Sequence, residues 1–129
     1  MCIFCTQGKL ETIVNSLGLD PYFPITSYSN TEDGDCLDNL NTSAEISLGG
    51  SFIGNLYTED DADWIAVSLR EGEFYSVDLM GFGENALFDP FLRIYDENTN
   101  LIASNDDFGG GYDSNLVFSP EKDGLFYIE

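Results

Sequence analysis

The sequence contains no histidine, and its cations are scarce: four lysines and arginines stand against 24 aspartates and glutamates in 129 residues. Without histidine the chain lacks the usual general base, the serine and cysteine triads and the H-E-x-x-H zinc site of metalloproteases. Four scattered cations make no basic face, which excludes nucleic acids and anionic membranes as partners. A carboxylate pair acting as acid and base is the enzymatic alternative that remains. We therefore predict that the chain is not an enzyme.

Cysteines and long apolar runs are also rare. Cys2 and Cys5 have the C-x-x-C spacing of half a zinc site, but zinc takes four ligands and the only further cysteine is Cys36. We therefore expect unpaired or transiently paired thiols. No run approaches the roughly 18 apolar residues of a membrane-spanning helix. Residues 1–16 lack the basic start and apolar middle of a Sec signal, so a signal for export would lie elsewhere.

What the chain does have is negative charge and a sufficient core. The formal net charge is -20, and a compact body with that charge repels itself unless cations bind to it. Bound calcium would relieve the repulsion, whereas a solvated acidic surface that serves solubility is the alternative. Hydrophobic residues make up 43% of the chain, which is enough to bury the core of one domain.

The first third of the chain differs from the rest. Four apolar residues recur there at helical spacing, namely Leu10, Ile13, Val14 and Leu17. Gly18 follows where a helix C-cap belongs, so the pattern predicts a short helix. Residues 20–43, with two prolines and a polar run, are typical of a linker. We therefore expect residues 1–43 to form an N-terminal segment and linker outside the main domain.

From about Ala44 onward, short alternating segments are separated by Gly, Asn and Asp turns, which indicates an all-β domain over residues 44–129. The predicted strands are Glu45–Leu48, Phe52–Tyr57, Ile65–Leu69, Tyr75–Leu79, Phe91–Tyr95, Leu101–Ser104, Asn115–Ser119 and Leu125–Glu129. About eight strands at these spacings predict an antiparallel β-sandwich of the jelly-roll type.

Acidic residues cluster in the turns between these strands. The clusters are Glu59–Asp63, Asp89-Pro90, and Asn105–Asp107 followed by Gly109–Asp113. Loops rich in carboxylate and amide oxygens, with glycines that turn carbonyls inward, suit a hard cation with six to eight oxygen ligands. Asp33-Gly34-Asp35 begins like an EF-hand loop, but Leu37 and Asp38 stand where that loop needs other residues. The alternative is that these residues only build turns.

Trp64 permits two interpretations. Exposed aromatic residues line grooves for sugars and peptides, but the place of Trp64 at the start of an alternating strand favours packing in the core or at its rim.

Six short motifs follow one another between Gly50 and Glu129, namely Gly54-Asn55-Leu56, Asp61-Ala62-Asp63-Trp64, Gly72-Glu73-Phe74-Tyr75, Asp89-Pro90-Phe91-Leu92, Asn105-Asp106-Asp107 and Gly124-Leu125-Phe126-Tyr127. In their order they resemble the bacterial pre-peptidase C-terminal domain. The resemblance implies a jelly-roll-like β-sandwich without catalysis, appended to a secreted protease or other exported hydrolase. It also implies calcium at Asp89, Asp106, Asp107 and Asp113, and less directly at Asp61 and Asp63.

The resemblance implies partners and a location as well. The expected partners are a covalently linked peptidase or hydrolase domain and a protein or polysaccharide polymer. The opening Met1–Cys5 is similar to the start of serralysin-like metalloproteases, which leave the cell by type I secretion, so we expect an extracellular protein. The alternative function is a stand-alone adhesion or polymer-binding module, favoured if Trp64, Phe108 or Tyr112 is exposed in a groove.

In one respect the sequence departs from the family pattern. The family domain continues past its Gly-x-Tyr-Tyr strand into a turn and a closing strand, whereas this sequence ends at Glu129. We therefore expect a domain truncated at its C-terminal end. In such a domain Leu125–Glu129 would lack strand partners and leave an exposed sheet edge that invites association.

Overall fold

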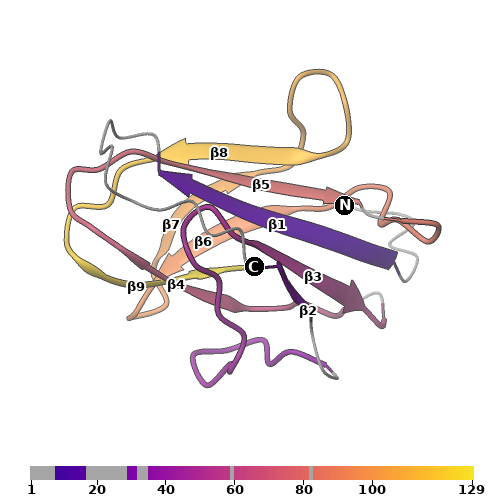
Figure 1. Cartoon of the computed structure of the whole chain (residues 1–129), viewed down its shortest axis with the longest axis horizontal. Helices are drawn as coiled ribbons and strands as arrows, with labels where there is room; N and C mark the ends of the chain where they lie inside the picture. Colours follow the sequence, from indigo (N-terminus) through magenta and orange to yellow (C-terminus); the bar gives the residue numbers. More distant parts are fainter. Residues whose placement is uncertain (1–7, 17–28, 32–34, 59, 82) are drawn as a thin grey trace.

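The computed structural model describes residues 8–16, 29–31, 35–58, 60–81 and 83–129, which form two facing β-sheets (Figure 1). The strands are β1 (Gly8–Ser16), β2 (Ser29–Thr31), β3 (Ser51–Leu56), β4 (Ile65–Leu69), β5 (Tyr75–Gly81), β6 (Leu92–Asp96), β7 (Leu101–Asn105), β8 (Ser114–Phe118) and β9 (Gly124–Ile128). No helix occurs within these ranges, and none that could cross a membrane. The predicted all-β sandwich is confirmed.

The two sheets have different strand orders. The first sheet runs β2-β3-β1-β5-β8 and the second runs β4-β9-β6-β7. Neighbouring strands are antiparallel, apart from β2 and β3, which run parallel. Seven of the eight predicted strands match β3 to β9 within a few residues. The chain crosses repeatedly from one sheet to the other, so the loops at one end bring together residues distant in sequence.

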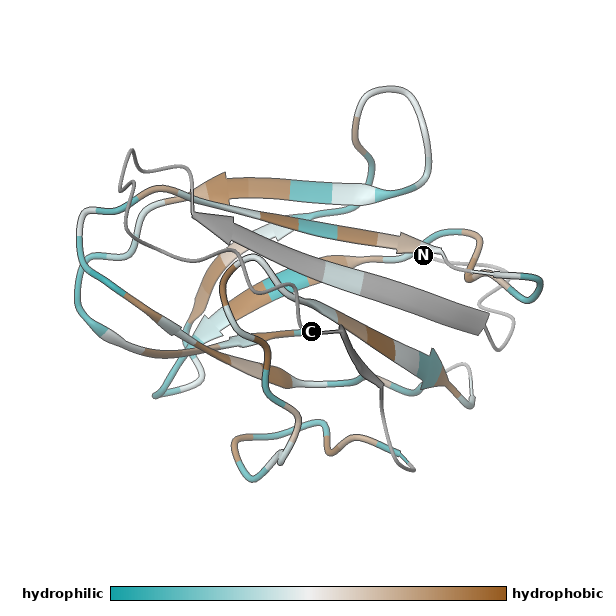
Figure 2. Ribbon diagram, in the orientation of Figure 1, coloured by the Kyte–Doolittle hydropathy of each residue, from teal (hydrophilic) through white to brown (hydrophobic). Residues whose placement is uncertain are grey.

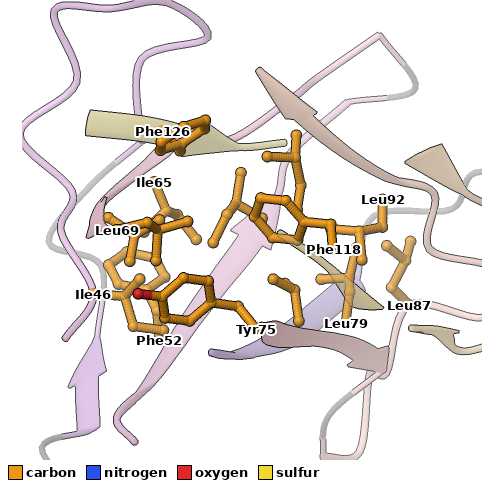
Figure 3. Packing of buried hydrophobic residues seen from close by; sticks show 14 residues of the cluster. Ile46, Phe52, Ile65, Leu69, Tyr75, Leu79, Leu87, Leu92, Phe118 and Phe126 are labelled. Atoms are coloured by element: carbon orange, nitrogen blue, oxygen red, sulfur yellow. The ribbon is translucent and has the colours of Figure 1, made fainter. Parts of the chain in front are cut away.

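The core lies between the sheets because side chains alternate along each strand. In β5 the buried residues are Tyr75, Val77 and Leu79, and in β6 Leu92 and Ile94 face them from the other sheet. Figure 3 shows these layers meeting, with Leu79 and Leu92 on facing strands. Hydrophobic residues concentrate on the strands and hydrophilic residues mostly on the loops (Figure 2).

The predicted N-terminal helix is wrong, because Gly8–Ser16 forms β1 in the interior of the first sheet. The helical spacing of four apolar residues was a weak signal, whereas the run Thr12-Ile13-Val14 consists of β-branched residues that favour strands. Long-range pairing decided the outcome, since β1 hydrogen-bonds to β3 on one side and to β5 on the other. Residues 8–16 therefore belong to the sandwich, on the N-terminal side of the boundary predicted at residue 44.

The predicted exposed edge at Leu125–Glu129 is also wrong. β9 lies inside the second sheet, paired with β4 from Ile65↔Ile128 to Leu69↔Gly124 and with β6 on its other side. All five residues of β9 pair with β4, and Phe126, Tyr127 and Ile128 pair with β6 as well. The edges of the second sheet are β4 and β7.

The edge of β4 is partly covered by the preceding segment. Ile46 donates its N–H to the carbonyl of Ala66 (2.9 Å), and Ala66 donates to the carbonyl of Ala44 (2.9 Å). The predicted strand Glu45–Leu48 is thus reduced to one parallel bridge between Glu45 and Ala66. Covering an edge in this way limits pairing with other chains.

The turn between β6 and β7 is held by the carboxylate of Asp96. Its Oδ1 accepts the N–H groups of Asn98 (2.8 Å) and Asn100 (2.9 Å). The Asn100 side chain also donates its Nδ2 to Asp96 Oδ2 (2.9 Å). This side-chain bond, followed by the backbone bonds, holds the pKa of Asp96 below its ordinary value of 3.8. Because the folded-state pKa is the lower one, the turn contributes stability at neutral pH that is lost as the pH falls below 3.8 and through the folded pKa.

Thr99 in this turn has a φ of 63°, a left-handed conformation that strains a β-branched residue. Asparagine adopts this conformation readily, so Thr99→Asn should stabilise the fold by up to about 1 kcal/mol. That gain would raise the melting temperature by about 3–6 °C in calorimetry. Thr99→Val keeps the shape and the strain, and it should bring no gain. An equal melting temperature for the Asn and Val variants would contradict the strain.

Candidate functional site

The loops that follow β3, β5 and β7 gather at one end of the sandwich. β3 and β5 both run antiparallel to β1 and therefore end on the same side, where β8 begins. In the second sheet β4 and β6 begin at this end, and β9 ends there. The loop before β8 projects from the body of the molecule (Figure 1). All the predicted calcium residues lie in these loops.

Between the two sheets at this end is a cavity of about 520 Å³. Its deep wall is largely apolar, made of Leu56, Ile65, Leu79, Leu87, Pro90 and Ile128. The more exposed lining residues are largely charged, namely Asp60, Asp61, Asp89, Arg93, Asp106 and Glu129. Two further polar residues, Thr12 and Asp63, are buried in the lining. The cavity therefore joins an apolar interior to an acidic mouth.

Three carboxylates converge beside this mouth. Asp35, Asp61 and Asp63 each place an oxygen within 4.8 Å of the other two. Oxygen ligands lie 2.3–2.6 Å from calcium, so oxygens that share one ion can be up to about 5 Å apart. The three carboxylates therefore fit one hard cation.

Backbone hydrogen bonds hold this acidic trio in place. Trp64 donates its N–H to the carbonyl of Leu37 (3.3 Å), which brings the segment after Asp35 beside the β3–β4 loop. Within that loop, Asp61 Oδ2 accepts the N–H of Tyr57 (2.5 Å). Asp63 is only 5% exposed. Three negative charges this close together, one of them buried, raise the electrostatic free energy of the folded protein. A bound cation offsets that increase.

A second acidic group lies on the β5–β6 and β7–β8 loops. Burial raises the pKa of Asp89 above its ordinary value of 3.8, and the negative charges of Asp106 and Asp107 raise that pKa further. The carboxylates of Asp106 and Asp107 therefore lie near enough to Asp89 for their charges to act on it. Asp89 and Asp106 line the cavity together with Asp61 and Asp63.

Asp113 forms two hydrogen bonds at the base of the β7–β8 loop. Its Oδ1 accepts the N–H of Gly81 (3.2 Å), and its carbonyl accepts the N–H of Phe108 (2.9 Å). A side chain at Gly81 would meet the carbonyl oxygen of Leu87 at 2.2 Å, so the chain passes closely here. Asp113 therefore fixes the base of the β7–β8 loop against the end of β5.

Trp64 is a packing residue, as the sequence favoured. Its ring stacks on Tyr95 with centroids 4.6 Å apart and contacts Tyr127 at 5.8 Å. Its Nε1 donates to Glu129 Oε2 (2.9 Å), and Glu129 also forms an ion pair with Arg93. Burial and the charge of Glu129 raise the pKa of Tyr95. This cluster lies outside the main core and closes one side of the cavity entrance through Arg93 and Glu129.

The sequence found most of the acidic residues at this end but missed Asp35. Asp35 lies in the predicted linker, and its partial EF-hand pattern gave no reason to place it beside Asp61 and Asp63. The other sequence candidates fall into two groups, Asp61 with Asp63 and Asp89 with Asp106 and Asp107. Cys36 is half-buried against the core, and Cys2 and Cys5 lie outside the described residues.

Comparisons with protein-family models, with curated proteins and with solved structures found no match for this chain.

Proposed function

We propose that the chain is a non-catalytic, calcium-assisted accessory domain of the pre-peptidase C-terminal type, attached to a secreted bacterial protease or hydrolase. The convergence of Asp35, Asp61 and Asp63 carries the calcium part of this proposal. The order of sequence motifs and the β-sandwich support the family. The attached enzyme would supply the catalysis, and the domain would aid its folding, secretion, solubility or targeting to a polymer.

The exposure of the trio fits calcium outside the cell. Asp35 is exposed and Asp61 is half-exposed, so the trio is open to solvent. Sites of this open kind belong with extracellular modules, whose dissociation constants are on the order of 10⁻⁴–10⁻³ M. An ion there would tie residues 35–37 to the β3–β4 loop and neutralise part of the net charge of -20. The fold would then be most stable after export.

Calcium should stabilise the folded chain through this trio. A cation at about 100 times its dissociation constant adds roughly 2.7 kcal/mol to the free energy of unfolding, or several degrees of melting temperature. Asp35→Asn should remove most of this shift in scanning calorimetry. Magnesium should give a smaller shift because it requires tighter octahedral geometry.

The matched control is Asp38→Asn, which removes the same charge from an exposed residue of the same segment and should keep the calcium shift. Sodium chloride at equal ionic strength controls for screening. Asp107→Asn examines the second acidic group. A calcium shift that survives Asp35→Asn but is lost in Asp107→Asn would move the ion to the β7–β8 loop. A shift no larger than that of sodium chloride would refute calcium binding.

Exposed aromatic rings favour polymer binding as a second function. Phe88 and Tyr112 contact each other with centroids 4.4 Å apart, and Phe108 is exposed on the same loop as Tyr112. Trp64, by contrast, is buried. Exposed rings of this kind bind sugar or peptide surfaces. Retention on an insoluble polymer that is lost in Phe88→Ala would support this function, and equal retention of the two proteins would contradict it.

A further inference from the structure

Thr12 marks the inner end of the cavity. Its side chain is 0% exposed and lines the cavity from β1, in the middle of the first sheet. Among the residues that the structure describes, no partner lies within hydrogen-bond distance of its Oγ1. A buried hydroxyl without a partner is costly, and such a group needs an explanation such as strain, a catalytic role or a bound species. The cavity therefore offers an unused hydrogen-bonding group at its apolar end.

The mouth of the cavity offers the opposite chemistry. Asp61, Asp89 and Asp106 line it from three different loops. Arg93 is cationic, but it forms an ion pair with Glu129 and lies over the ring of Phe91, 4.2 Å from its centroid. The charge presented at the mouth is therefore negative, and the repulsion acting on Asp89 indicates that a positive charge is favoured there.

We propose that this cavity binds a small organic cation with an apolar body. The body fills the apolar interior, a hydrogen-bonding group on it meets Thr12 Oγ1, and an ammonium group faces the carboxylates at the mouth. A volume of about 520 Å³ is in the range of cavities that bind small molecules, about 300–1,000 Å³. The cavity shares Asp61 and Asp63 with the acidic trio proposed for calcium, whereas Asp35 belongs to the trio and does not line the cavity.

Three probes with one aromatic body test the charge. Tyramine carries an ammonium group, tyrosol a neutral hydroxyl and para-hydroxyphenylacetate a carboxylate. Titration calorimetry of the wild-type chain in chelator should show tyramine binding at least about tenfold more tightly than tyrosol, because charge-assisted hydrogen bonds are the stronger ones. The carboxylate should bind most weakly. Equal binding of the three probes, or no binding of tyramine at millimolar concentration, would overturn the proposal.

Phenethylamine lacks only the phenol hydroxyl of tyramine and therefore tests Thr12. Tyramine should bind the wild type about five- to tenfold more tightly than phenethylamine, and Thr12→Val should abolish that preference. Valine has the shape of threonine without the unused hydroxyl, so the variant should fold and melt at least as high as the wild type. Thr12→Ser keeps a hydroxyl and should keep part of the preference. An unchanged tyramine-to-phenethylamine ratio in Thr12→Val would refute the contact.

Two further arms separate this proposal from its alternatives. Asp89→Asn should weaken tyramine binding about three- to tenfold. The control Glu121→Gln, which removes one charge from an exposed residue outside the lining, should leave tyramine binding unchanged. If the two variants weaken tyramine binding equally, only the net charge of the protein affects binding, which would contradict the proposed site.

Further measurements identify the chemistry of the occupant and separate its binding from that of calcium. The amide of Nα-acetyl-lysine presents an ammonium group without an aromatic body. If it binds as tightly as tyramine, a basic side chain is sufficient for binding, which would contradict the proposal. Asp35→Asn should lose the calcium shift and keep tyramine binding, whereas Thr12→Val should keep the calcium shift and lose the preference for tyramine over phenethylamine. Failure of one proposal therefore leaves the other measurable.

Discussion

Replacing Trp64 with alanine should cost about 3–5 kcal/mol of the free energy of unfolding, as expected for a large buried aromatic side chain. The indole is 7% exposed and holds Tyr95 and Tyr127 together. Its loss leaves a void on the outer side of the second sheet. It also removes the N–H donor to Glu129, which helps to fix Arg93 at the cavity.

Denaturant unfolding measures this cost, and two variants control for it. Trp64→Phe keeps a ring against Tyr95 but removes the N–H donor, so its cost should be smaller. Phe108→Ala removes an exposed ring and should change stability by no more than about 0.5 kcal/mol. If Trp64→Ala lowers the free energy of unfolding no more than Phe108→Ala does, Trp64 is not a packing residue. The alternative interpretation of Trp64 as a ligand-binding aromatic would then be favoured.

Ile128→Ala should cost about 2–5 kcal/mol, because it truncates a core residue in the interior strand β9. Ile128 is 1% exposed and pairs in register with Ile65 on β4 and with Ile94 on β6. A strand at an unpaired sheet edge would tolerate such a change far better. This variant therefore tests the central position of β9.

Leu125 on the same strand is the matched control, since it is 45% exposed. Leu125→Ala should lower the free energy of unfolding by no more than about 0.5 kcal/mol. Both variants can be measured by denaturant unfolding. If the dependence of the free energy of unfolding on denaturant concentration is equal for the two variants, their midpoints differ through stability alone. Similar small costs at both positions would indicate that β9 is frayed from its neighbours.

The sequence predicted local structure better than pairing. β5 and β6 were predictable because Tyr75, Val77 and Leu79 alternate with polar residues between turn signals, which is a local pattern. Gly8–Ser16 was misassigned because helical spacing and β-branched composition disagree there, and the strands that decide the outcome lie far along the chain. The order β4-β9-β6 could not be predicted either, because the residues of a strand do not by themselves determine which strands pair with it.

The candidate site divides in the same way. Carboxylates that cluster between predicted strands are visible in a sequence, so Asp61, Asp89 and Asp106 were found. The approach of Asp35 depends on the backbone bond from Trp64 to Leu37, which no local pattern encodes. Thr12 was hidden for a related reason, because its importance arises only from the cavity into which the fold places it.

The place of β1 in the first sheet has a consequence for how the chain is made. During synthesis the N-terminal residues emerge first, yet β1 needs both β3 and β5 before its backbone groups are paired. Until Tyr75–Gly81 has left the ribosome, β1 cannot pair with β5. Pairing of strands that lie so far apart in the sequence is slow. The nascent chain therefore passes through a stage in which β3 is already available and β5 is not. At that stage β1 and β3 can pair with each other, but the side of β1 that pairs with β5 in the folded sandwich is still an open sheet edge.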